Sequence, residues 1–131
     1  MNEKTKEALE SLNRALVRLE EALKESKNQT GSTLYIDGTI QRFEFCIELL
    51  WKTLRRALLE LGLESGSPRE AIQMGYQAGL IQNEKLWLQM LRDRNQTSHT
   101  YEEETAREIF ERIPEYYKLM TNTLTEIQKR V

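Results

Sequence analysis

The sequence is poor in four residue types: its 131 residues include one cysteine, one histidine, two prolines and six glycines. A single cysteine excludes an internal disulfide, and one cysteine with one histidine cannot complete a tetrahedral zinc site within one chain. We therefore expect no metal and no other cofactor. Because Cys46 lies in the apolar stretch FEFCIELLW, it is expected to be a small buried hydrophobic residue rather than a nucleophile.

Long apolar runs are also absent. No segment approaches the length needed to span a membrane, and the charged N-terminus MNEKTKEALE lacks the apolar core of a signal peptide. We expect a soluble, cytoplasmic protein with no membrane partner. The formal net charge is −2, so nucleic-acid binding would require a local basic patch rather than the charge of the whole chain.

Leucines at helical spacing mark a first amphipathic helix near the N-terminus. They recur at alternating steps of three and four residues at Leu9, Leu12, Leu16, Leu19 and Leu23. The polar segment from Lys24 to Thr33 is expected to end this helix in a loop around Gly31. Residues 34–36 are apolar and could be briefly extended, but they are too few for a sheet. Asp37 is the expected N-cap of the next helix.

The next apolar stripe predicts a second long helix that ends at Gly62. Its members are Ile40, Phe43, Ile47, Leu50, Leu54, Leu58 and Leu61. The segment SPRE then indicates the start of a short third helix. Ser67 is its expected cap, Pro68 fits its first position, and Glu70 would complete a capping box. This helix is predicted to end near Gly79.

Two further helices are predicted, from Asn83 to Ser98 and from a cap at Thr100, with Glu103 completing a capping box. Pro114 lies inside the last helix, where we expect a kink rather than a break. The apolar stripe of this helix is Ala106, Phe110, Ile113, Tyr117, Met120, Leu124 and Ile127. The sequence thus predicts an all-α fold, an antiparallel up-and-down bundle of four long helices and one short helix, with residues 1–131 as a single domain.

Polar residues continue the apolar face of the fourth helix at its C-terminal end, in RDRNQTSHTY. On a regular helix, Arg94 and Ser98 continue one apolar stripe, and Asn95 and His99 continue the adjacent one. Polar groups in such positions are costly unless they are paired or line a cleft or interface. Arg94 and His99 lie roughly 140° apart on a regular helix. They would converge if the helix unwound near Ser98, as a cap at Thr100 favours.

This set of side chains suits a particular chemistry. Histidine exchanges protons near neutral pH, and arginine can bind a phosphate through two parallel hydrogen bonds. Together they suit metal-free RNA cleavage, in which a base takes the 2′-hydroxyl proton and a cation stabilises the phosphorane. A symmetric dimer would bring two histidines to one groove, as acid and base. A surface ion pair with a helix cap would give the same pattern, so spacing alone leaves both interpretations open.

The motif Arg94-x4-His99-x-Tyr101 resembles that of HEPN domains, the higher eukaryotes and prokaryotes nucleotide-binding superfamily. Three longer segments are similar to one branch of it, the bacterial nucleotidyltransferase substrate-binding proteins. These segments are DGTIQRFEFCIELLWKTLRR (37–56), GSPREAIQMGYQAGLI (66–81) and LWLQMLRDRNQTSHTYEEETAREIFERI (86–113). The resemblance covers most of the chain beyond the first predicted helix.

The resemblance implies an all-helical homodimer encoded beside a minimal nucleotidyltransferase, with which it would form a toxin–antitoxin pair. It implies that Arg94 and His99 cleave RNA with the assistance of Asn95, and that the partner neutralises this activity. In some such pairs the antitoxin transfers AMP to the tyrosine of the motif, which would make Tyr101 the acceptor. An alternative implication is a non-catalytic subunit that binds a nucleotide or substrate for its nucleotidyltransferase.

Other residues allow further interpretations. Lys52, Arg55 and Arg56 form a basic cluster that is either a solvated face or a site for RNA backbone or a nucleotide. Three aromatic residues, Phe43, Phe45 and Trp51, are expected in the core or a dimer interface. Glu44, if buried among them, would need a partner such as an arginine, and we do not expect it to be catalytic.

Two function classes are excluded or disfavoured by the same pattern. The chain has no glycine-serine nucleotidyltransferase signature and no paired aspartates for magnesium, so it cannot be the transferase itself. A helical dimer that acts only as an interaction module would show an interface stripe without convergent polar groups, unlike residues 94–99.

Overall fold

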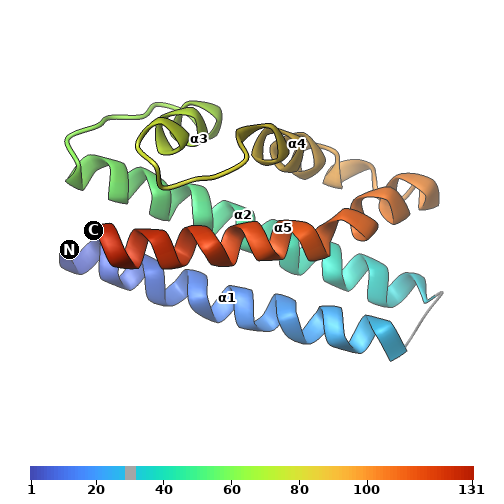
Figure 1. Ribbon diagram of the computed structural model, residues 1–131. Coiled ribbons are helices and arrows are strands. Elements are labelled where there is room, and N and C mark those ends of the chain that lie inside the picture. The colour runs from blue at the N-terminus through green and yellow to red at the C-terminus, as the bar shows by residue number, and fades with distance from the viewer. Residues whose placement is uncertain (29–31) are drawn as a thin grey trace.

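The computed structural model describes residues 1–28 and 32–131, and the protein is helical through most of them (Figure 1). The helices are α1 (Glu3–Asn28), α2 (Thr33–Glu60), α3 (Pro68–Gln77), α4 (Glu84–Asn95) and α5 (Glu103–Arg130), with a short 3₁₀ turn, η1 (Thr97–His99), between the last two. The described residues contain no β-strand. The predicted all-α helical bundle is therefore confirmed.

The three long helices form the body of the molecule. Figure 1 shows α1 antiparallel to both α2 and α5, which run in the same direction, so that the two chain termini lie near each other. The shorter helices α3 and α4 pack across α2 on the side away from α1. The fourth helix is shorter than expected, with 12 residues, because the chain leaves α-helical geometry after Asn95.

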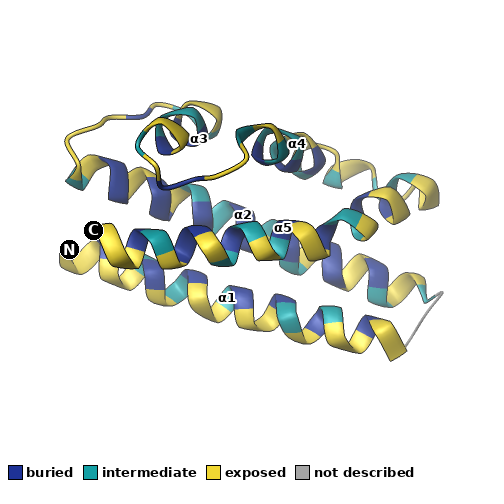
Figure 2. Ribbon diagram, viewed as in Figure 1, coloured by how far each residue is buried: buried dark blue, intermediate teal, exposed yellow. Residues whose placement is uncertain are grey.

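Burial of one face of each helix holds the bundle together (Figure 2). The stripe of α1 is confirmed from Leu9 to Leu19, each of its leucines being at most 4% exposed. The stripe of α2 is confirmed from Ile40 to Leu58, but Leu61 is 40% exposed because it lies past the end of the helix. Each fully buried aliphatic side chain contributes roughly 1.5–3 kcal/mol relative to an exposed one.

The predicted connection between α1 and α2 was too long. Helix α1 continues to Asn28, and the buried hydroxyl of Ser26 donates a hydrogen bond to Leu23 O at 2.9 Å. Helix α2 begins at Thr33, so residues 34–36 are helical rather than extended. Asp37 is therefore not the N-cap: Ser32 occupies that position, and Ile36 is already buried one turn before Ile40. Gly31 lies outside the described residues.

The predicted end of α2 and the predicted boundaries of α3 are confirmed. Gly62 has a φ of +83°, and the N–H of Leu63 binds Leu58 O at 2.8 Å, which closes the end of α2. The Ser67 hydroxyl accepts a hydrogen bond from the N–H of Glu70 at 3.1 Å, with Pro68 in the first turn. Gly79, with a φ of +80°, ends the turn after α3.

The inward face of α5 differs in part from the prediction. Ile109 and Tyr116 are buried, whereas Phe110 and Tyr117, expected in the stripe, are only half-buried. The helix continues through Pro114 without a break, and Figure 1 shows its N-terminal part inclined toward α4. Within the described residues, no helix is long and apolar enough to cross a membrane.

Candidate functional site

The apolar face of α4 ends in a buried carboxylate. Trp87 and Met90 are fully buried, and Asp93, one turn further along, is 6% exposed. A buried carboxylate is costly unless it is paired and hydrogen-bonded. Asp93 was not singled out from the sequence, although its position three residues after a core methionine on the same helix was a signal.

Asp93 is held by two residues of α5. Arg112 donates two hydrogen bonds to its carboxylate, Nε to Oδ2 at 2.7 Å and Nη2 to Oδ1 at 2.8 Å. The Tyr116 hydroxyl donates a third, to Oδ2 at 2.5 Å. The hydrogen bonds to Asp93 raise the pKa of Arg112, and burial followed by the bond to Asp93 raises the pKa of Tyr116. This Asp93 cluster, formed by these three residues, ties the C-terminal end of α4 to α5.

Two threonine hydroxyls donate hydrogen bonds to the backbone where the chain leaves α4. The Thr97 hydroxyl donates to Arg94 O at 2.7 Å, and the Thr100 hydroxyl donates to Thr97 O at 3.0 Å. The N–H of His99 binds Gln96 O at 2.9 Å, which forms the 3₁₀ turn. The prediction that the helix unwinds near Ser98 is confirmed, but Thr100 is not the cap of α5. Its hydroxyl serves the preceding turn, and α5 begins at Glu103.

The structure places the predicted site residues on an accessible surface. Asn95, Ser98 and His99 are exposed, and Arg94 is half-buried. Arg94 forms an ion pair with Glu48 of α2, a residue that the sequence interpretation missed. The partner of Arg94 depends on how α4 crosses α2, which spacing along the chain does not reveal.

His99 and Tyr101 lie on the segment between α4 and α5. Their ring centroids are 6.2 Å apart, in an edge-to-face arrangement. Tyr101 is 79% exposed and lies before the start of α5 at Glu103. No hydrogen bond joins Arg94 to His99 among the bonds of the described residues: Arg94 pairs with Glu48, and His99 lies beside Tyr101.

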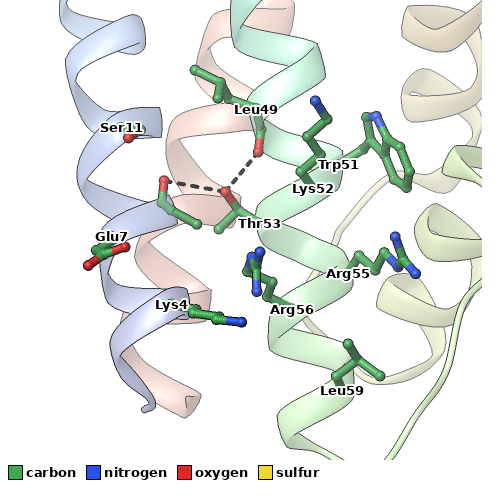
Figure 3. A pocket seen from close by; sticks show the side chains of 11 residues that line it. Lys4, Glu7, Ser11, Leu49, Trp51, Lys52, Thr53, Arg55, Arg56 and Leu59 are labelled. Carbon is green, nitrogen blue, oxygen red and sulfur yellow. Dashed lines mark hydrogen bonds between the residues drawn. The ribbon is translucent and has the colours of Figure 1, made fainter.

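The predicted basic cluster lines a groove between α1 and α2. Lys52, Arg55 and Arg56 are exposed on α2, and Lys4 of α1, which the sequence interpretation missed, joins them. The groove has a volume of about 680 Å³. In Figure 3 the side chains of Lys4 and Arg56 point toward each other, whereas Arg55 extends to the opposite side of α2.

The aromatic residues predicted for the core or a dimer interface differ in burial according to the face of α2 on which they lie. Phe43 is fully buried and stacks on Tyr116, with ring centroids 5.6 Å apart. Trp51 is half-buried against the core, and Phe45 is 54% exposed. Glu44 is half-buried rather than buried.

The single thiol of the chain is not placed to react. Cys46 is fully buried, as predicted, and burial raises the pKa of its thiol to about 12. The described part of the chain contains no group of three or more His, Cys, Asp or Glu side chains placed to hold a metal ion.

These features define a class of all-helical protein with an accessible Arg, Asn, His and Tyr set where α4 passes into α5. Residues 7–129 match the family model described as "Nucleotidyltransferase substrate binding protein like". The match spans nearly the whole chain, so the protein belongs to this family, as the resemblance of its motifs implied.

Similar proteins come from two bacteria. A curated Haemophilus influenzae protein, "Probable ribonuclease HepT", is 28% identical over 100 residues, which cover 72% of this chain and 68% of that protein. A Thermus thermophilus protein of known crystal structure is 38% identical, with a TM-score of 0.82 over 88% of this chain and 98% of that one. A second solved structure, from Haemophilus influenzae, is described as the fold of a substrate-binding domain of a nucleotidyltransferase. It is 23% identical, with a TM-score of 0.82 over 92% and 98% of the two chains, and so shows the fold alone.

The Asp93 cluster yields a prediction for stability. Arg112→Met would leave the buried Asp93 carboxylate without its cation, so we expect a loss of about 3 kcal/mol in the free energy of unfolding. Tyr116→Phe removes one hydrogen bond to a charged group, for an expected loss of about 1.5 kcal/mol. Urea unfolding followed by circular dichroism measures both.

Arg107→Met is the matched control. Like Arg112, Arg107 is an arginine of α5 that pairs with a carboxylate. Its partner is Glu103 of the same helix, at 3.2 Å, and both side chains are largely exposed. An exposed pair contributes at most about 1 kcal/mol, so this variant should remain close to the parent protein. Equal losses in the Arg107 and Arg112 variants would contradict a stabilising role for the cluster.

Proposed function

We propose that this protein is the toxin of a toxin–antitoxin pair and acts as a metal-independent endoribonuclease of the HEPN type. The observation that carries the proposal is that Arg94, Asn95 and His99, all of them partly or fully exposed, lie within six residues where α4 ends and the next turn begins. Family membership and the similarity to a protein named as a probable ribonuclease support it. Each of the three side chains has a role in cleavage by the RNA's own 2′-hydroxyl.

In this reaction the 2′-oxygen attacks the adjacent phosphorus and the bond from phosphorus to the 5′-oxygen breaks. One histidine accepts the 2′-hydroxyl proton, and a second donates a proton to the departing 5′-oxygen. Arg94 stabilises the negative charge that develops on the phosphoryl oxygens, with Asn95 as an additional hydrogen-bond donor. Because His99 is the only histidine of the chain, the second one must come from another copy.

A homodimer that faces two copies of this surface would complete the site. Apolar residues adjoin the Glu48–Arg94 ion pair along both helices, namely the exposed Phe45 on α2 and the half-buried Leu91 on α4. Exposed apolar side chains such as Phe45 are typical of the core of an interface between copies. A two-fold axis near this ion pair would place both His99 residues in one groove.

Glu48 has a defined part in this proposal. It holds the guanidinium of Arg94 in place before RNA arrives, which reduces the conformational entropy lost on phosphate binding. Arginine has five donors, so it can keep this contact and still present an edge to a phosphate.

The central prediction concerns His99. His99→Ala should lower the RNA cleavage rate in EDTA by at least about 10²-fold, because it removes the general acid–base group. The unfolding midpoint should stay unchanged, because His99 is exposed. A fluorogenic RNA substrate measures the rate.

Gln96→Ala serves as the matched control, because Gln96 is an exposed neighbour on the same turn. It should cleave like the parent protein. Full activity in the His99 variant would reject the catalytic role.

For the antitoxin we propose a cognate minimal nucleotidyltransferase that transfers AMP to Tyr101. The phenol oxygen would attack the α-phosphorus of ATP, releasing pyrophosphate, and the 79% exposure of Tyr101 leaves it open to another enzyme. The phosphate would add negative charge about two residues from His99 in sequence, where it would repel RNA.

This role of Tyr101 predicts a change in mass. Co-expressed with its partner nucleotidyltransferase, the wild-type protein should gain mass in AMP-sized steps, and Tyr101→Phe should not. Tyr76→Phe is the control, because Tyr76 is also exposed but lies on α3. An unmodified wild-type protein, or modification that persists in the Tyr101 variant, would exclude this acceptor.

A second function is favoured by the family description itself: a non-catalytic subunit that binds a nucleotide or substrate for a separate nucleotidyltransferase. It would use the same accessible residues to bind a phosphate without cleaving RNA. Calorimetry with ATP, in the presence and absence of the partner, tests this function. It is supported by nucleotide binding in a protein that cuts no RNA, and rejected by the absence of binding in both cases.

A further inference from the structure

The groove between α1 and α2 concentrates positive charge in a protein that is negative as a whole. Its lining residues include four cations, Lys4, Lys52, Arg55 and Arg56, whereas the net charge of the protein is −2. Three of them lie on the side toward α1, whereas Arg55 extends to the opposite side of α2. None of the four forms an ion pair with any described residue. The lining residues include one carboxylate, Glu7, whose side chain points away from α2 in Figure 3.

The composition of the groove favours a polyanion over a protein surface. Lysine is depleted in protein–protein interfaces, yet two lysines line this groove. The Thr53 hydroxyl already donates its hydrogen bond to Leu49 O at 2.7 Å, so it has no hydrogen left to donate to a ligand in the groove. Exposed cations along an open groove suit the oxygens of a phosphate backbone.

Helix α2 links the groove to the proposed cleavage site through Glu48. Glu48, Lys52 and Arg55 are separated by four and three residues, so they share one face of this helix. Glu48 contacts Arg94, and Lys52 lies one turn beyond it, about 6 Å along the helix axis. A strand bound at Arg94 would therefore reach the cations of the groove next.

We infer that this groove binds the phosphate backbone of single-stranded RNA that extends from the Arg94–His99 site. The inference rests on the proposed function and adds a binding surface to it. Lys52 and Arg56 lie about one turn apart on α2, which suits the successive phosphates of one strand. Lys4 adds a third cation from α1, opposite Arg56. Trp51, the aromatic residue of the groove, is half-buried against the core rather than free to stack on bases, so binding should be independent of sequence.

Salt-dependent binding to a labelled single-stranded oligouridylate tests the inference. The full chain with His99→Ala serves as the parent, so that the RNA remains intact. Each phosphate contact on a single strand contributes about 0.7 to the slope of log K against log salt concentration. Adding Lys52→Gln and Arg56→Gln should therefore reduce the slope by about 1.4.

Lys118→Gln with Lys129→Gln is the matched control, because both lysines are exposed on α5 and the charge change is the same. Its slope should equal that of the parent. A groove variant with an unchanged slope, or equal reductions in the groove and control variants, would overturn the inference. So would a groove variant that binds RNA normally but no longer co-purifies with the nucleotidyltransferase, since the groove would then hold an acidic protein.

The experiment separates this inference from the proposed function. Cleavage is measured independently, with His99 intact. If the protein cleaves RNA and the groove variant shows no change in slope, the ribonuclease function stands and RNA binding by the groove is rejected. A reduced slope in a protein that cuts no RNA would retain the groove as a binding site and reject the ribonuclease.

Discussion

The arrangement of the candidate site depends on one buried carboxylate, that of Asp93. It lies where the apolar face of α4 ends, and three hydrogen bonds from Arg112 and Tyr116 hold it against α5. The chain leaves α4 two residues later, so the cluster fixes the point from which the turn carrying His99 departs. At the other end of this turn, the buried Ala106 anchors the start of α5. A short polar segment is thereby displayed between two fixed helix ends.

Helix α2 connects this segment to the rest of the surface. One of its faces contributes the largest share of apolar residues to the core, including Phe43, which stacks on Tyr116 of the Asp93 cluster. The opposite face carries Glu48, which pairs with Arg94, and then the cations of the α1–α2 groove. The same helix thus supports the site from within and extends it along the outside. This dual use explains how a protein of net negative charge could bind RNA at one restricted surface.

Helical periodicity and local chemistry made part of the structure predictable from the sequence. Leucine spacing identified the buried face of α1, and Ser67 with Pro68 identified the start of α3. Both signals depend only on residues that are neighbours along the chain. Asp37 was wrong as a cap because Ser32 and the buried Ile36 extend α2 toward its N-terminus by one turn. The predicted residues at the end of α4 are partly or fully exposed. Their partners came from other helices, Glu48 from α2 and Arg112 with Tyr116 from α5, and such pairings depend on helix crossing rather than on spacing.

The chemical identity of the cut ends tests the central claim most directly. Mass spectrometry of an RNA treated with the purified protein in EDTA would identify the termini that cleavage produces. Attack by the 2′-hydroxyl, assisted by His99 and Arg94, leaves a 2′,3′-cyclic phosphate on one fragment and a 5′-hydroxyl on the other. An RNA with deoxyribose at the cut position should remain intact. Fragments with 5′-phosphate and 3′-hydroxyl ends, or an RNA that stays uncut, would contradict the account.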